Sequence, residues 1–302
     1  MARGTSRAWF IIPAVLALLL IWTIVSALSN KGPSSSYEGR GAAVVTLSAP
    51  EGGARDAAPK VLERLVALGV DAQIAEAEDD RIRIALRRVA DPSEAIAAAT
   101  TPEPLSFYVV DEGVQQPQDV PDAASAAPAP QRLHPWLAAT SRADLRAKVE
   151  RAGVPEGLSP LVECIPAPQR KAPPLCAAWL GRPTPLRAAD IREIHLGADR
   201  RTEEPLVAIT FSEEGARAFE EISRAAAGKM LVVSALGEVQ ARPRIHGPGD
   251  LMQGGRWTFS TRTGDTDRPV AIERAQRIAA AAKLPRLPRL EIKALEEARA
   301  PR

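Results

Sequence analysis

The residues whose types could do chemistry are few and lie far apart in the sequence. The three histidines, His134, His195 and His246, are isolated from one another. The chain has no G-x-S-x-G elbow, no H-E-x-x-H pair and no Walker loop ending in Gly-Lys-Ser/Thr. A lone histidine is more often a surface or hydrogen-bonded residue than a catalyst. We therefore expect no enzymatic activity, no cofactor and no metal site.

The two cysteines, Cys164 and Cys176, have two interpretations. In an oxidising compartment they would form a disulfide, which would stabilise the fold by about 3 kcal/mol in the chain-entropy model. Alternatively, they are two unpaired and partly buried thiols. No histidine stands near them at the spacing of zinc ligands, so we do not expect a zinc site.

The acidic cluster at residues 76–80 could bind a cation or form a solvated turn. Its carboxylates, Glu76, Glu78, Asp79 and Asp80, lack the spacing of a calcium loop, which favours the solvated turn.

The glycine-rich segment 246–255 could cradle a phosphate or connect two strands. It contains no lysine and does not lead into a helix, so a connection is favoured. Met252 and Trp257 are large apolar residues in and beside it, and both are candidates for contact with a polypeptide. Trp257 alternates with Phe259, which favours a core position for Trp257 instead.

Composition and charge bound the class of protein. The chain has 302 residues, of which 45% are hydrophobic and 25% charged, which is typical of globular proteins. Lys and Arg total 39 and Asp and Glu total 37, so the net charge is only +2. This balance gives no reason to expect nucleic acid as a partner.

The amino-terminal segment predicts a membrane anchor. Residues 9–28 form an uncharged apolar run of twenty residues, long enough to cross a bilayer as a helix. Arg3 and Arg7 precede it, so residues 1–8 should remain in the cytoplasm. A cleavable signal peptide ending near Ala27 is the alternative, although the apolar run is longer than usual. Residues 29–41 would be a flexible tether. The protein would thus be anchored in the inner membrane of a bacterium, with the residues after the tether in the periplasm.

Beyond the tether, the patterns predict an α+β fold of two ferredoxin-like subdomains. Residues 42–112 alternate strand, helix, strand, strand, helix, strand, with Asp91 capping the second helix and Pro92 opening it. Residues 113–186 are rich in proline and read as an insertion, apart from a polar helix over 141–152 that begins at Ser141. Residues 187–302 repeat the order of the first subdomain, with one further strand in the tail at 287–295.

One unit of this second half is especially well defined. Strand 206–211 leads to a helix capped by Ser212, with an apolar stripe that includes Phe219 and Ile222. Gly228 ends the helix, and strands follow at 229–235, 239–245 and 256–261. A second helix is expected over 268–283.

These segments resemble the extracytoplasmic domain of SecD, a subunit of the protein-export machinery. The resemblance rests on "VAITFSEEGARAFEEIS", "GKMLVV", "LGEV" and "ARPRI" in the second half, and on "VLERLVALGV" in the first. It covers about two thirds of residues 42–295. It implies a base near the membrane, a head that can swing, and partners that include an unfolded secreted polypeptide and the Sec translocon or a complete SecD/SecF.

The chain also departs from the family's pattern. Leu236-Gly237 stands where the family usually has Asp-Gly. SecD proteins continue into a bundle of membrane helices with an acidic residue, whereas the single expected span here has no ionisable residue. We therefore expect this chain not to harness a proton gradient by itself.

The sequence leaves three functions to compare. The resemblance and the outward topology favour a module that binds emerging polypeptide during translocation. The alternative is a structural or docking component of a cell-envelope complex. A hydrolase that uses the same fold is a third, but no set of residues supports it.

Overall fold

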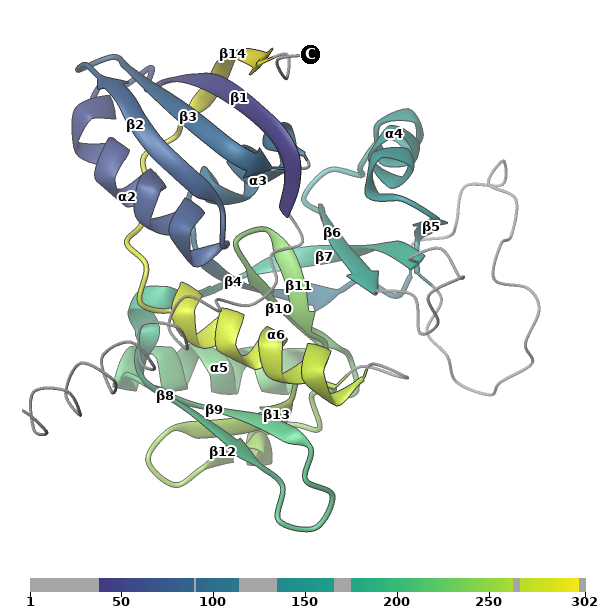
Figure 1. Ribbon diagram of the computed structural model, residues 1–302. Helices are drawn as coiled ribbons and strands as arrows, with labels where there is room; N and C mark the ends of the chain where they lie inside the picture. The colour runs from purple at the N-terminus through teal and green to yellow at the C-terminus, as the bar shows by residue number, and fades with distance from the viewer. Residues whose placement is uncertain (1–37, 90, 114–134, 166–174, 263–266, 299–302) are drawn as a thin grey trace, which may run out of the picture.

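The protein has a mixed α+β fold, seen in Figure 1 as three sheets with helices packed on and between them. The computed structural model describes residues 38–89, 91–113, 135–165, 175–262 and 267–298. The anchor predicted at residues 9–28 lies outside the described residues. None of the helices in these described ranges has the length and hydrophobicity that a membrane crossing requires.

The first unit is a four-stranded sheet covered by two helices. Its chain order is β1 (Glu38–Ser48), α2 (Ala54–Ala67), β2 (Asp71–Ala77), β3 (Arg81–Val89) and α3 (Pro92–Ala99). The predicted elements are therefore present, although β1 already begins inside the predicted tether. The sheet order is β14-β1-β3-β2, in which β14 (Glu291–Ala298) comes from the end of the chain.

The predicted boundaries of the first unit, residues 42–112, are therefore wrong. Strand β4 (Leu105–Val110) pairs with strands of the central sheet, and β14 takes the fourth place beside β1 (Figure 1). Burial explains the exchange, because Leu105 and Phe107 belong to the core of the second unit. The described side chains of β14 are instead partly or fully exposed, as suits an edge strand.

The central sheet contains the strands that the predicted insertion supplies. Its order is β4, β10 (Leu231–Ala235), β11 (Glu238–Ala241), β6 (Ser159–Ile165), β7 (Leu175–Arg187) and β5 (Leu137–Ala139). Strand β7 also pairs with β4, so β4, β10, β11, β6 and β7 form a closed ring of five strands. Most of segment 135–186 is thus part of the fold, including α4 (Arg142–Ala152), which begins where predicted.

The third sheet completes the second unit. Its order is β12 (Leu251–Met252), β13 (Arg256–Ser260), β9 (Pro205–Phe211) and β8 (Ile191–Ala198). Helices α5 (Glu213–Ala225) and α6 (Arg268–Ala281) lie between this sheet and the central one (Figure 1). Two short 3-10 turns cover Ala188–Asp190 and Pro248–Asp250.

The second ferredoxin-like plait expected over 187–302 is therefore not a single sheet. Strands β9 and β13 lie in the third sheet, whereas β10 and β11 lie in the central one. Strand β10 is buried along its whole length, so both of its faces need cover. Helix α6 and the core it shares cover one face, and the closed strands β6 and β7 cover the other.

The turn between β10 and β11 connects the two units through their cores. Leu236 and Gly237 both have left-handed backbones, with φ of 51° and 80°, as the tight turn predicted there requires. The Leu236 side chain is only 6% exposed and lies in the hydrophobic core of the first unit. The second unit therefore inserts one apolar side chain into the first.

Candidate functional site

A groove lies where the two units meet. It encloses about 280 Å³ between helix α3, helix α4, strand β6 and the β10–β11 turn. Its floor is apolar, whereas Glu94, Arg142, Arg146 and Glu238 stand along its rim. The apolar lining consists of Ala97, Ala98, Val149, Pro160, Val162 and Leu236.

Two N-caps fix the helices that carry the rim. The Asp91 carboxylate accepts a hydrogen bond from the backbone N–H of Glu94 at 2.9 Å. The Ser141 hydroxyl accepts one from the backbone N–H of Asp144 at 3.1 Å. Such caps satisfy N–H groups that a helix leaves free in its first turn. Glu94 and Arg142 thereby stand in the first turns of two facing helices.

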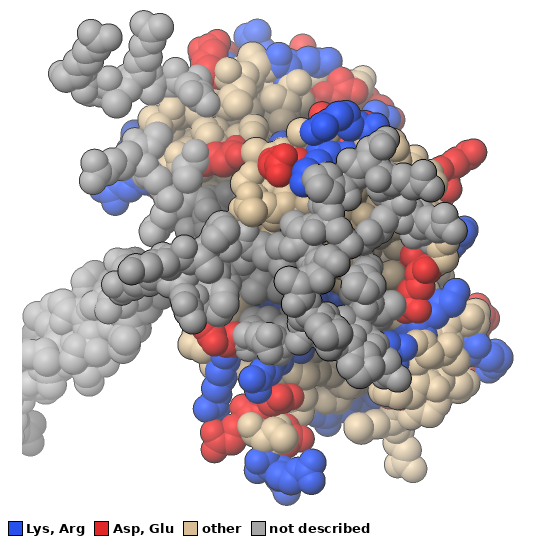
Figure 2. All heavy atoms as spheres, turned by 90° about the vertical axis from the view of Figure 1, so that its right-hand side faces the viewer, with Lys and Arg blue, Asp and Glu red and all other residues tan. Residues whose placement is uncertain are grey.

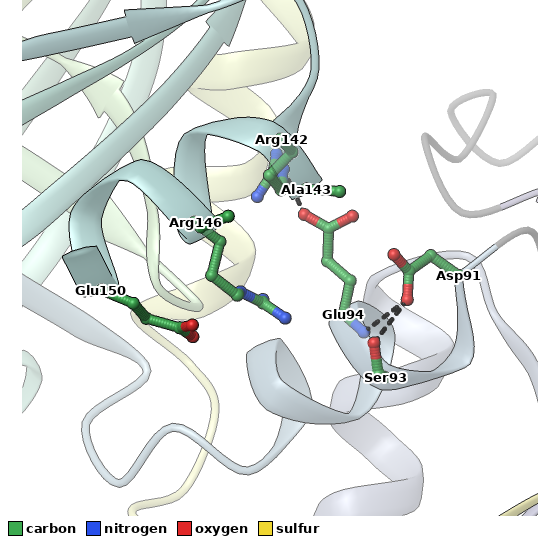
Figure 3. A pocket seen from close by; sticks show the side chains of 8 residues that line it. Asp91, Ser93, Glu94, Arg142, Ala143, Arg146 and Glu150 are labelled. Carbon is green, nitrogen blue, oxygen red and sulfur yellow. Dashed lines mark hydrogen bonds and ion pairs between the residues drawn. The ribbon is translucent and has the colours of Figure 1, made fainter. Parts of the chain in front are cut away.

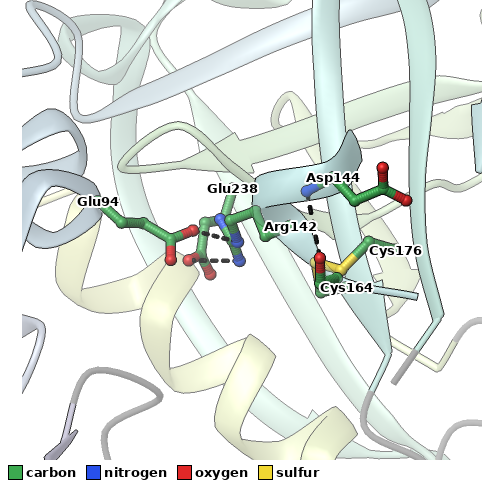
Figure 4. The surroundings of a disulfide bond; sticks show 7 residues. Glu94, Arg142, Asp144, Cys164, Cys176 and Glu238 are labelled. Atoms are coloured by element: carbon green, nitrogen blue, oxygen red, sulfur yellow. Dashed lines mark hydrogen bonds and ion pairs between the residues drawn. A yellow bond between two sulfur atoms is a disulfide. The ribbon is translucent and has the colours of Figure 1, made fainter. Parts of the chain in front are cut away.

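Arg142 connects the rim across the groove. It forms an ion pair with Glu94 of the first unit and a second one with Glu238 of β11, at 3.0 Å (Figure 4). Glu238 is also paired with Arg277 of α6 at 2.8 Å. This chain of charges runs from α3 through α4 to α6, so it holds the walls of the groove together.

Burial makes this arrangement costly for Glu94. Desolvation raises the pKa of the Glu94 carboxyl above its ordinary value, and the attraction of Arg142 opposes that rise without cancelling it. Repulsion from Asp91 and Glu238 adds to the increase. A charged group held at such a cost favours a role in positioning the groove's walls over a role in stability.

A second, more polar cleft adjoins the groove. It encloses about 220 Å³ and shares Glu94, Arg142 and Arg146 with the groove. Figure 3 shows Arg146 reaching between Glu150 on its own helix and Glu94 on the facing one. The lining residues of the two clefts include no cysteine or histidine. The two clefts therefore combine apolar and charged lining residues.

Strand β8 forms a second surface of interest. It pairs with β9 along one edge and stands at the end of its sheet. Its side chains are mostly exposed, and Leu196 is 47% exposed. No described strand pairs with its other edge, and such an edge presents backbone N–H and C=O groups to which an extended chain can add as a further strand.

Both signs of charge occur on the described surface. On the face shown in Figure 2, Lys and Arg side chains and Asp and Glu side chains are both visible among the described residues, and neither sign covers the face. This pattern agrees with the near-neutral net charge. At the acidic turn, Arg81 pairs with Glu78 at 2.8 Å and with Glu76 at 3.6 Å, so these carboxylates are engaged in surface ion pairs.

The residues predicted to contact a polypeptide have different environments. Met252 is 58% exposed at the start of the glycine-rich turn, so its contact role stays a prediction. Trp257 is 3% exposed and packs between Phe219 and Phe259, with ring centroids 4.9 and 4.2 Å away. The contact role predicted for Trp257 is therefore wrong, because its ring belongs to the core.

Cys164 and Cys176 form a disulfide in the structure, and they stand opposite each other on β6 and β7 (Figure 4). The disulfide lies on the same strands that complete the central sheet. His195 and His246, which were not expected to be catalytic, each face a carboxylate on the surface, Glu193 at 3.0 Å and Asp250 at 3.3 Å.

Sequence reasoning missed the groove and its rim. The caps at Asp91 and Ser141 predicted where the two helices begin, but Glu94, Arg142 and Glu238 are far apart in the chain. Each of them reads as an ordinary exposed charge in its own segment. Only the exchange of β4 for β14 and the folding of the proline-rich segment bring them together.

Comparison with known families supports the resemblance found in the sequence. Residues 166–266 match the family model described as SecDF, P1 head subdomain. The motif string at 206–245 and strand β8 lie inside this match. No curated protein is similar enough to the chain to count as a match.

Three solved structures of SecDF are similar to this chain at low identity. One, SecDF in a super-membrane-facing form, is 21% identical over 94% of this chain with a TM-score of 0.42. Another, titled as a membrane component that enhances protein export, is 22% identical over 85% of this chain and 99% of its own length, with a TM-score of 0.40. The third, a translocon-associated membrane protein from Thermus thermophilus, is 20% identical over 92% of this chain with a TM-score of 0.34. This chain spans 35% of the length of the first and of the third.

Proposed function

We propose that this chain is a SecD-like component of protein export that lies outside the cytoplasmic membrane and binds polypeptide as it emerges. The observation that carries the proposal is the match of residues 166–266 to the P1 head subdomain of SecDF. The predicted anchor at residues 9–28 would hold the domain near the translocon and raise its local concentration there. In this proposal the chain acts by binding, not by catalysis and not by using a proton gradient.

Two features of the structure support polypeptide binding. The edge of β8 with which no described strand pairs offers main-chain hydrogen bonds, which tolerate many sequences, as an export factor requires. The groove at α3 and α4 offers an apolar floor of a size that suits one or two side chains. Unfolded chains present both backbone groups and apolar side chains, whereas folded proteins bury most of them.

Binding of an unfolded secretory protein tests this proposal. A fluorescently labelled, reduced and unfolded precursor is titrated with residues 38–302, and anisotropy reports the bound fraction. We expect binding of the unfolded precursor and at least tenfold weaker binding of its folded form. Equal binding of both forms, or of neither, would contradict the proposal.

Two variants separate the edge from the groove. Leu196→Lys places a charge on the β8 edge, and such charges oppose the addition of a further strand. Ala97→Trp fills the groove, whose wall Ala97 forms. Val66→Lys is the control, because Val66 is 63% exposed on α2 of the first unit. We expect weaker binding from Leu196→Lys, from Ala97→Trp or from both, and no change from the control.

A docking role in an envelope complex is the second candidate. Helix α4 supports it, because Leu145 is the only fully buried residue among its eleven residues, so the described part of the chain leaves most of its surface exposed. Affinity capture of the full chain from membranes, with and without a block of secretion, distinguishes the two. One stoichiometric partner that is unaffected by the block would favour docking.

A further inference from the structure

The third sheet ends at β8 with part of its apolar layer exposed. Ile194 and Leu196 of β8 lie opposite Ile209 and Val207 of β9, and both of these β9 side chains are fully buried in the core of the second unit. Because paired residues of neighbouring strands share one face of a sheet, the two β8 side chains lie on the core face as well. Ile194 is partly buried there, whereas Leu196 is 47% exposed. The core layer thus reaches the edge of the sheet and has no neighbour beyond it among the described strands.

Helix α6 covers the core side of the same strands. It packs against both β8 and β9. Its start lies beside the hairpin that joins these two strands, because Arg268 pairs with Glu203 at 3.1 Å. Ile272, in the second turn of the helix, is 41% exposed. The strand and the helix that packs against it therefore both carry an exposed apolar side chain.

The opposite face of β8 is polar. Glu193 and His195 lie on it, opposite Thr210 and Ala208 of β9, and Gly197 is the third residue on this face. The Glu193 carboxylate lies 3.0 Å from Nε2 of His195, and both side chains are 55% exposed. Successive side chains of a strand point to opposite faces of its sheet. A strand added beside β8 would therefore place alternate side chains on an apolar face and on a polar one.

The regular part of β8 sets the length of the segment that can be added. Its pairing with β9 is regular over the six residues 193–198, and the register shifts between Ile191 and Glu193. Such a shift marks a bulge, where regular pairing ends and the strand bends. The outer edge therefore offers a template of six residues, of which every second one faces the core side.

We propose that the outer edge of β8 selects extended polypeptide segments, about six residues long, whose apolar side chains occupy every second position. The inference rests on the proposed function and names the class of segment that binds at this surface. The backbone groups of a strand edge pair with another extended chain and not with a helix. The apolar side chains of such a segment would cover Leu196, and its polar side chains would remain in water beside Glu193 and His195.

This pattern is that of a strand with one buried face, which an exported protein exposes only before it folds. A segment of the same composition with its apolar residues in one block fits the edge less well. If three of its six residues are apolar and consecutive, at least one of them must lie on the polar face. The block therefore loses at least one apolar contact that the alternating segment makes.

Two fluorescently labelled peptides of identical composition test the proposal. Each has three valines and three threonines between the same charged ends; the residues alternate in one peptide and form two blocks in the other. The full chain in a lipid nanodisc is titrated into each peptide, and anisotropy reports the bound fraction. An unfolded precursor serves as the reference probe. We expect the alternating peptide to bind at least tenfold more tightly than the block peptide.

Two variants and a crosslinking experiment locate the selection. In Leu196→Ser the preference should fall below threefold, whereas the control, Val66→Ser, should keep it, because Val66 is 63% exposed on α2 of the first unit. A photoreactive residue at Leu196 should crosslink to the valines of the alternating peptide, and one at His195 should crosslink to its threonines. Mass spectrometry identifies the crosslinked positions.

The results separate this inference from the proposed function. Equal binding of both peptides, or of neither, while the unfolded precursor still binds would overturn the inference and leave the proposed function in place. Adducts from Leu196 and His195 that fall on valine and threonine without distinction would overturn it too. Absence of binding by the precursor as well would overturn the proposed function and the inference together.

Discussion

Leu236 offers a direct test of how the two units are held together. Its backbone is left-handed, with φ of 51°, a conformation that costs a non-glycine residue about 1 kcal/mol or more. Its side chain is 6% exposed in the core of the other unit. The structure therefore tolerates local strain because the side chain gains more by burial than the backbone loses.

This balance predicts an unusual order of stability for two substitutions. Leu236→Ala removes most of the buried side chain and keeps the strain, so it should lower the free energy of unfolding of the first unit by about 3 kcal/mol. Leu236→Gly removes the side chain but relieves the strain, so it should lower that free energy by only about 2 kcal/mol. In a helix or strand, the glycine variant would be the less stable of the two.

Urea denaturation of residues 38–302, followed by circular dichroism and by hydrogen exchange of β1 and β3, measures the effect. The control is Leu196→Ala, which shortens an exposed leucine and should change the free energy of unfolding by less than about 0.5 kcal/mol. The reasoning is refuted if Leu236→Ala costs less than about 1 kcal/mol, or if the glycine variant is less stable than the alanine variant.

Three further predictions concern single groups. Burial raises the pKa of the Glu94 carboxyl in the folded state, so its contribution to stability falls as the pH rises through that pKa. Glu94→Gln should therefore be as stable as the parent chain at pH 7, or more stable. A clear loss of stability of this variant at pH 7 would contradict the reasoning. Replacing Cys164 and Cys176 together by serine should lower the free energy of unfolding by about 3 kcal/mol, since the bond closes a loop with a sequence separation of 12; reduction of the parent chain should have the same effect, and no change in either experiment would refute the estimate. Ser212→Ala removes the cap that accepts from the N–H of Gly215 at 3.1 Å and should lower the melting temperature through a loss of about 1 kcal/mol, whereas Ser212→Asp should restore it; equal melting temperatures for all three would show that the cap contributes nothing.

The helices and most strands were predictable because their signals are local. Asp91 and Ser212 are caps in the structure as the sequence predicts, and Ser141, where a helix was predicted to begin, is a third. Each accepts a hydrogen bond from the N–H three residues on. The alternation at residues 81–86 likewise predicted the buried face of β3, with Ile82, Ile84 and Leu86 all buried. Such patterns depend on neighbours within a few residues.

The pairing of strands was not predictable in the same way. Strand β14, the last described strand, pairs with β1, the first one. Strand β4 pairs with β10 of the central sheet and not with the strands that precede it in the sequence. These choices depend on which faces need burial once all elements are present. Arg64 shows the same limit, because in its segment it reads as a polar residue beside an apolar stripe, yet it is fully buried by connections that are distant in sequence.

The central claim is that this domain holds an emerging polypeptide, and site-specific crosslinking during secretion tests it most directly. A photoreactive residue is placed at Leu196 on the β8 edge, at Met252, or at Val66 on the first unit, all of them exposed. A secretory precursor is then arrested partway through export. The account predicts adducts with the arrested precursor from Leu196 that are lost when export is completed, and none from Val66. Absence of adducts from both Leu196 and Met252, or equal adducts from Val66, would contradict it.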